Sequence, residues 1–124
     1  MAAAENPNLP SPTPGRLDFT TASAPDGVRV VSLSGEIDHV TGDTLRDALH
    51  VSGPRPRIVA DFTRVTFMDS SGINILITAH QELTEADGWL RLASPSSAVH
   101  RTITIVGLDA VIDCHPGVTE ALAA

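Results

Sequence analysis

The chain has 124 residues, a formal net charge of -7 and a single cysteine, Cys114. This length suits one ordinary domain with one modest core, and the acidic balance argues against nucleic acid or an anionic membrane as a partner. With one tryptophan, three phenylalanines and no tyrosine, the chain cannot assemble an aromatic platform for stacking bases. A lone cysteine provides no disulfide framework, so we expect a reducing cytoplasm and a core role for Cys114.

Residues 1–15 are rich in Ala, Pro, Ser and Asn and show no hydrophobic periodicity. We therefore expect a disordered N-terminal tail, followed by one domain over residues 16–124. The N-terminus lacks the basic-then-apolar pattern of a secretion signal, and no apolar run approaches the length needed to cross a bilayer. Both observations agree with a cytoplasmic location and no membrane partner.

The domain is expected to begin with an antiparallel hairpin. Leu17–Thr21 is a short strand candidate, and Val28–Ser34 alternates well enough for a second strand. Between them, Ala24–Gly27 carries proline and glycine at positions suited to a turn. Two strands joined by so short a loop pair antiparallel.

Strand and helix patterns then alternate along the chain. The expected strands are residues 57–61, 89–93 and 111–114, and the expected helices are residues 41–51, 70–86 and 118–122. Alternation of this kind predicts an α/β domain whose sheet contains parallel pairs with right-handed crossovers. The pattern does not decide whether all helices lie on one face of the sheet.

The segment 96–106 carries conflicting signals. Ser96 and Ser97 are typical helix caps, and Val99, Ile103 and Val106 keep helical spacing. The run at residues 102–106 is nevertheless β-branched throughout and alternates, which favours a strand. Local evidence leaves the two structures equally supported.

The corner at Asp69 and Ser70 stands between a buried strand and the long helix expected at 70–86. Asp and Ser are the residue types that cap helix N-termini, and a plain cap is the simplest interpretation. A helix start also offers unpaired N–H groups and a partial positive charge, which suit a phosphate. The doubled serine at this exposed corner further suggests a hydroxyl that is presented to another protein and modified.

Other chemistries find less support in the sequence. Ser70 lacks the first glycine of the Gly-x-Ser-x-Gly elbow of serine hydrolases, since Met68 stands there. The five histidines are far apart and have no cysteine partner, so no metal site is expected, and no glycine-rich phosphate loop is present. Asp38 and Asp69 should both emerge at strand ends, where binding sites collect. Two independent helix-start acids, or the carboxylate pair of a hydrolase, remain alternatives, and the hydrolase ranks last.

Four segments together resemble a STAS domain, and among such domains the bacterial anti-sigma factor antagonists of the SpoIIAA and RsbV kind. They are Leu33–His39 (Leu-Ser-Gly-Glu-Ile-Asp-His), the helix at Thr41–Leu45, Phe67–Ile73 (Phe-Met-Asp-Ser-Ser-Gly-Ile) and Pro95–Leu108. The resemblance runs in order from about Leu17 to the C-terminus. It implies a single α/β domain with a mixed central sheet flanked by helices, and a helix at residues 96–106.

The resemblance also implies a function and its residues. Family members of this kind are not enzymes; the serine after the aspartate, here Ser70, is phosphorylated by a partner anti-sigma factor that is itself a serine kinase. Ser71 is a weaker candidate for phosphorylation. The expected partner-binding residues are Asp38, His39, Asp69, Ser71, Gly72 and Asn74.

In such a switch, the unphosphorylated chain binds the kinase and frees a sigma factor, and a phosphatase acts on the phosphorylated form. The chain itself needs no cofactor. The alternative is a STAS scaffold or accessory subunit of a signalling or lipid-transport complex in which the serine is silent. Asn74 and the run at residues 102–104 depart from the usual family pattern, which bears on the choice of partner more than on the fold.

Overall fold

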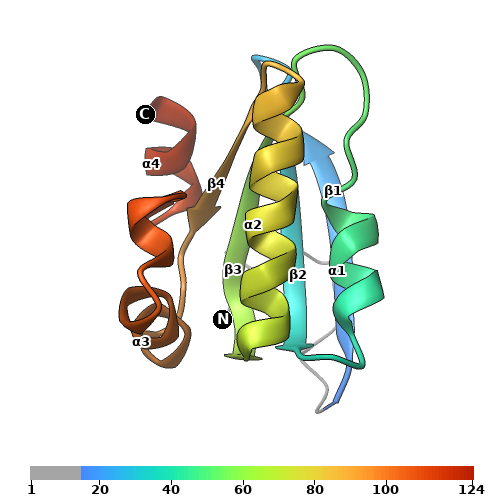
Figure 1. Cartoon of the computed structure of the whole chain (residues 1–124). Coiled ribbons are helices and arrows are strands. Elements are labelled where there is room, and N and C mark those ends of the chain that lie inside the picture. The colour runs from blue at the N-terminus through green and yellow to red at the C-terminus, as the bar shows by residue number, and fades with distance from the viewer. Residues whose placement is uncertain (1–14) are drawn as a thin grey trace.

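Five strands form one sheet, and they lie side by side in the order in which they occur along the chain (Figure 1). The computed structural model describes residues 15–124. The strands are β1 (Leu17–Ser23), β2 (Arg29–Ile37), β3 (Arg57–Met68), β4 (Trp89–Ala93) and β5 (Asp113–His115). The tail predicted at residues 1–15 falls, except for Gly15, outside the described residues and stays a prediction.

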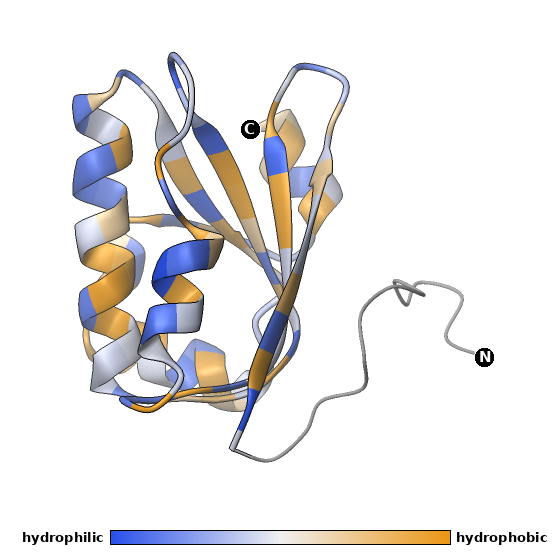
Figure 2. Cartoon of the chain, turned by 90° about the vertical axis from the view of Figure 1, so that its right-hand side faces the viewer, coloured by the Kyte–Doolittle hydropathy of each residue, from blue (hydrophilic) through white to orange (hydrophobic). Residues whose placement is uncertain are grey.

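The sheet is mixed. β1 and β2 pair antiparallel, with Leu17 opposite Gly35, whereas β2, β3, β4 and β5 pair parallel. This arrangement confirms the predicted hairpin and the predicted parallel pairs. Figure 2 shows hydrophobic and hydrophilic residues alternating along the strands, as expected where successive side chains point to opposite faces.

Helices cover the two faces of the sheet unequally. The described helices are α1 (Gly42–Ala48), α2 (Ser70–Glu85), α3 (Ser97–Ile105), the short 3-10 helix η1 (Leu108–Ala110) and α4 (Val118–Ala123). Buried side chains of α1, α2, α3 and η1 join one large core with Ile58 and Ala60 of β3. The intervening Val59 points to the other face, where a smaller cluster forms with Ala121 of α4. Among residues 15–124, no helix has the length and apolar character needed to span a membrane.

The ambiguous segment at residues 96–106 is helical, as the family resemblance implied. The Ser96 hydroxyl accepts a hydrogen bond from the backbone N–H of Val99 at 3.3 Å, which caps α3. Val99 and Ile103, one turn apart, are buried in the large core. Burial of this helical stripe outweighs the strand propensity of the β-branched run.

Three strands are longer than predicted, and the extra residues of β2 and β3 matter for the site. β1 continues past Thr21 to Ser23. β2 continues past Ser34 to Ile37, and β3 continues past Asp61 to Met68. Ile37 and Met68 are partners in the parallel pairing of these strands. Because the two strands end together at one edge of the sheet, the residues that follow them start from neighbouring positions.

Candidate functional site

A backbone hydrogen bond joins the ends of β2 and β3. The N–H of Asp69 donates to the carbonyl of Ile37 at 3.1 Å. Asp38 follows Ile37 in the chain, and Ser70 follows Asp69. The two residues therefore leave the sheet from adjoining points. The sequence predicted that both acids follow strands, and the structure places those strand ends side by side.

Asp69 is the N-cap of α2. Its backbone is extended, and its carboxylate accepts a hydrogen bond from the N–H of Ser71 at 2.8 Å. Ser70 is then the first residue of the helix and is exposed to solvent, while Asp69 and Ser71 are partly buried. The cap predicted from sequence is thus real, and it coexists with a presented hydroxyl at Ser70.

Asp38 organises the loop between β2 and α1. One oxygen of its carboxylate accepts from the backbone N–H groups of Val40, at 2.8 Å, and Thr41, at 3.0 Å. The buried Thr41 hydroxyl accepts from the N–H of Asp38 at 2.9 Å and donates to the carbonyl of Glu36 at 2.8 Å. These bonds fold the loop back onto the end of β2 and fix the position of the Asp38 carboxylate.

The same bonds lower the pKa of Asp38 below its ordinary value. The hydrogen bond from the Thr41 amide is the largest cause, and desolvation, the second largest, opposes it. The Val40 amide, the Thr41 hydroxyl and the nearby His39 add to the lowering. Asp38 is therefore ionised at neutral pH and supplies a negative charge on the loop that leaves the sheet next to Asp69.

Gly72 allows α2 to start close to the strands. It is buried, and a β-carbon built at this position would lie 2.5 Å from Cγ2 of Ile37 and 2.7 Å from Cγ of Met68. No side chain fits there without movement. Among the predicted partner-binding residues, Gly72 therefore contributes close packing beneath the corner rather than exposed surface.

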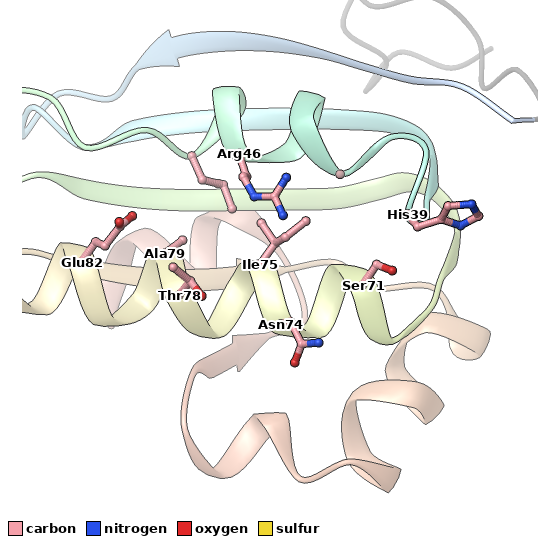
Figure 3. A pocket seen from close by; sticks show the side chains of 10 residues that line it. His39, Arg46, Ser71, Asn74, Ile75, Thr78, Ala79 and Glu82 are labelled. Atoms are coloured by element: carbon pink, nitrogen blue, oxygen red, sulfur yellow. The ribbon is translucent and has the colours of Figure 1, made fainter.

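A groove of about 400 Å³ lies between α1 and α2, next to the corner. Figure 3 shows His39, Ser71 and Asn74 around it, together with Arg46 from α1 and Glu82 from α2. Its walls also include apolar side chains, namely Leu49, Ile75 and Ala79. Three of the predicted partner-binding residues thus line one groove. The packing of α1 against α2 brings these residues together.

Sequence reasoning did not single out two exposed apolar residues at this corner, Val40 and Phe67. Val40 follows Asp38 by two residues, and Phe67 precedes Asp69 by two. That symmetry is visible in the sequence, but the exposure of the two side chains is not. Within residues 15–124, no cluster of three or more His, Cys, Asp or Glu side chains is placed to hold a metal ion.

Comparison with known proteins connects this architecture with one family. The STAS domain model matches residues 17–121. An anti-sigma F factor antagonist of Paenibacillus polymyxa is 29% identical over 99 residues, which cover 77% of this chain and 85% of that protein.

Solved structures agree with the sequence comparison. An anti-sigma factor antagonist from Mycobacterium paratuberculosis is 33% identical, with a TM-score of 0.77 over 86% of this chain and 92% of the other. SpoIIAA is similar in its unphosphorylated form (27% identity, TM-score 0.68, covering 85% and 93%) and in the phosphorylated form from Bacillus (25% identity, TM-score 0.61, covering 86% and 97%).

Proposed function

The chain belongs to the STAS domain family, and we propose that it is a cytoplasmic anti-sigma factor antagonist switched by phosphorylation of Ser70. In this proposal the unphosphorylated chain binds an anti-sigma factor that is a serine kinase, and the bound kinase releases its sigma factor. The kinase supplies ATP and the catalytic groups, whereas this chain supplies only a hydroxyl. A phosphatase that removes the phosphate resets the switch.

The observation that carries the proposal is the accessibility of Ser70. It is an exposed residue at the first position of α2, held there by the Asp69 cap and by the hydrogen bond from Asp69 to Ile37. Ser71 is partly buried, and its side chain faces the groove between α1 and α2 (Figure 3). Because a kinase must enclose the hydroxyl that it phosphorylates, Ser70 is the better acceptor.

The start of α2 also suits the product of the reaction. A phosphoserine carries a charge of roughly -1.5 to -2 at neutral pH. The partial positive charge and N–H groups of a helix N-terminus stabilise such a group in the free protein. Phosphorylation at Ser70 therefore requires no change of fold.

The same phosphate weakens the complex, because Asp69 directly precedes Ser70 and Asp38 directly follows Ile37, whose carbonyl accepts the hydrogen bond from Asp69. Enclosing a dianion next to two acids adds desolvation and repulsion that the free protein does not experience. A penalty of about 3–4 kcal/mol corresponds to a loss of two to three powers of ten in affinity. A change of this size is sufficient to dissociate the partner.

The test is phosphorylation of wild type, Ser70→Ala and Ser71→Ala by purified anti-sigma factor serine kinases with radiolabelled ATP, followed by mass spectrometry of the labelled peptide. We expect wild type and Ser71→Ala to be labelled on Ser70 and Ser70→Ala to remain unlabelled. Ser70→Ala should also stay bound to the kinase in the presence of ATP, while wild type dissociates.

Equal labelling of Ser70→Ala and wild type would show that the acceptor is a different residue. If wild type binds partners but is labelled by none of the kinases, the scaffold function without a switch replaces the proposal. Ser71→Ala is the matched control, because it removes a neighbouring hydroxyl from the same turn of the same helix.

A further inference from the structure

Val40 and Phe67 are exposed apolar side chains at the edge of the sheet where Ser70 is presented. Val40 is 71% exposed and Phe67 is 47% exposed. Neither belongs to the hydrophobic clusters of the described residues. Single exposed apolar residues are ordinary on protein surfaces. What distinguishes these two is that they come from the two segments that carry Asp38 and Asp69.

Strand pairing and the hydrogen bonds of the loop place Val40 and Phe67 close to the same strand ends. Phe67 is the partner of Glu36 in the pairing of β2 and β3. The carbonyl of Glu36 accepts from the Thr41 hydroxyl, and the N–H of Val40 donates to Asp38. Val40 is therefore held in a loop that folds back on the residue beside Phe67, and the acids and Ser70 lie at the same strand ends.

Any kinase that phosphorylates Ser70 must cover this region. A protein interface of standard size buries about 800 Å² on each partner, which corresponds to a patch of roughly 15 Å radius. Phe67 is three residues from Ser70 along the chain, and Val40 is three residues from Ile37, which is hydrogen-bonded to Asp69. Because three residues of extended chain span only about 10 Å, both fall within such a patch. A few side chains that fill well-packed, desolvated pockets near the centre of an interface supply most of its affinity, whereas rim charges mainly affect association rate.

We propose that Val40 and Phe67 are the apolar anchors by which the anti-sigma factor kinase holds this chain, each entering a recess whose rim carries Lys or Arg side chains opposite Asp38 and Asp69. This inference rests on the proposed function, since it names how the partner of Ser70 is held. The charges favour a basic partner over a second copy of this chain, because a second copy carries the same acids and a net charge of -7.

The test measures binding and phosphorylation of Val40→Ser and Phe67→Ser by the purified anti-sigma factor kinase that labels Ser70. We expect the Kd of each variant for the kinase to rise about tenfold, with a matching fall in kcat/KM and little change in kcat.

Val51→Ser is the matched control: Val51 is 40% exposed, and it lies in the connection that enters β3 at the end opposite Ser70 (Figure 1). Thermal melting checks that each variant is folded, and Val40→Ser provides the decisive result if Phe67→Ser is unstable.

The outcomes separate this inference from the proposed function. If Ser70 of wild type is labelled but folded Val40→Ser binds as tightly as Val51→Ser, the anchors are wrong and the function stands. If Ile105→Ser, which alters a 75% exposed side chain at the end of α3, weakens binding instead, the partner docks on α3 and the inference is overturned. If wild type is neither bound nor labelled by any anti-sigma factor kinase, both proposals fail.

Discussion

The backbone N–H of Asp69 lies 3.1 Å from the carbonyl oxygen of Ile37, and this hydrogen bond holds the start of α2 against the end of β2. One strand pair thereby positions both the Asp38 loop and the Ser70 hydroxyl. The Asp38 loop is in turn closed by its own bonds to Val40 and Thr41. The corner therefore presents the hydroxyl and the neighbouring charges with a geometry fixed before any partner arrives.

Gly72→Ala should disturb this corner. The new methyl group would lie 2.5 Å from Cγ2 of Ile37 and 2.7 Å from Cγ of Met68, so that α2 or the strand ends must move. Overpacking of this kind costs about 1–3 kcal/mol, from which the better helix propensity of alanine subtracts at most about 1 kcal/mol. We expect urea unfolding to show a net loss of stability and the phosphorylation of Ser70 to slow.

Asn74→Ala is the control for Gly72→Ala. Asn74 is exposed two residues further along the same helix, and alanine there improves helix propensity without a clash. Its free energy of unfolding should equal or slightly exceed that of wild type. A Gly72→Ala variant as stable as Asn74→Ala would show that the packing beneath the corner tolerates a methyl group.

Asp38→Asn should reveal the contribution of the Asp38 charge to stability through its pH dependence. The folded state lowers the pKa of Asp38, chiefly through the Thr41 amide. The resulting stabilisation is therefore fully present above the ordinary value of 3.8 and is lost as the pH falls through the lower folded pKa. We expect Asp38→Asn to be less stable than wild type at pH 7, with the difference shrinking below about pH 4.

Thr41→Val provides the comparison for Asp38→Asn. It removes a hydroxyl that bonds to Asp38 and Glu36 in the same loop. This hydroxyl is only a minor cause of the lowered pKa of Asp38, and the Asp38 carboxylate itself stays in place. The loss of stability in Thr41→Val, measured by urea unfolding from pH 7 to pH 3, should depend far less on pH. A constant difference between Asp38→Asn and wild type over this range would contradict a role for the Asp38 charge.

Most of the fold could be predicted from the residues, because strand alternation and helix spacing are local signals. Local signals do not decide the segment 96–106, since its β-branched run and its helical stripe point to different structures. The family resemblance implied the helix, and the burial of Val99 and Ile103 in the core is the physical reason for it. The position of α4 was equally open. The pattern of residues 118–122 marks an apolar side but does not say that it packs beside Val59, on the face opposite α1 and α2.

Part of the candidate site was predictable, because some of its hydrogen bonds are local. Asp69 as a cap follows from its place before a helical run, and its bond to the Ser71 amide is local. The bond from Asp69 to Ile37 depends on the pairing of β2 with β3, which no local pattern specifies. The bonds that close the Asp38 loop are local by comparison, since they all lie within residues 36–41. The exposure of Val40 and Phe67 depends on which surfaces the helices leave uncovered.

Cys114 should react slowly with alkylating reagents. Burial, followed by the nearby charges of Asp109 and Asp113, raises the pKa of its thiol to about 11. At neutral pH the thiolate fraction is then roughly two powers of ten below that of a free cysteine, and the greater nucleophilicity of the more basic thiolate recovers only about one power of ten. We expect iodoacetamide to modify Cys114 at least tenfold more slowly than glutathione, with the rate increasing towards pH 11. A rate equal to that of glutathione at pH 7 would show an exposed thiol.

Ser70→Asp and Ser70→Asn should separate the effect of charge from the loss of the hydroxyl. Asparagine and aspartate have nearly the same shape, but only aspartate adds a negative charge, and that charge is about half that of a phosphate. An acid at the first position of α2 also interacts favourably with the helix N-terminus, so the thermal midpoint of Ser70→Asp should not fall below that of Ser70→Asn. In binding to the anti-sigma factor kinase, we expect Ser70→Asn to approach the affinity of wild type. The affinity of Ser70→Asp should fall about tenfold, and that of the phosphorylated protein by two to three powers of ten. Calorimetric titration of the kinase with wild type, the two variants and the phosphorylated protein measures these affinities. Equal weakening by Asn and Asp would mean that the kinase requires the hydroxyl itself, and that repulsion at Asp38 and Asp69 does not drive dissociation.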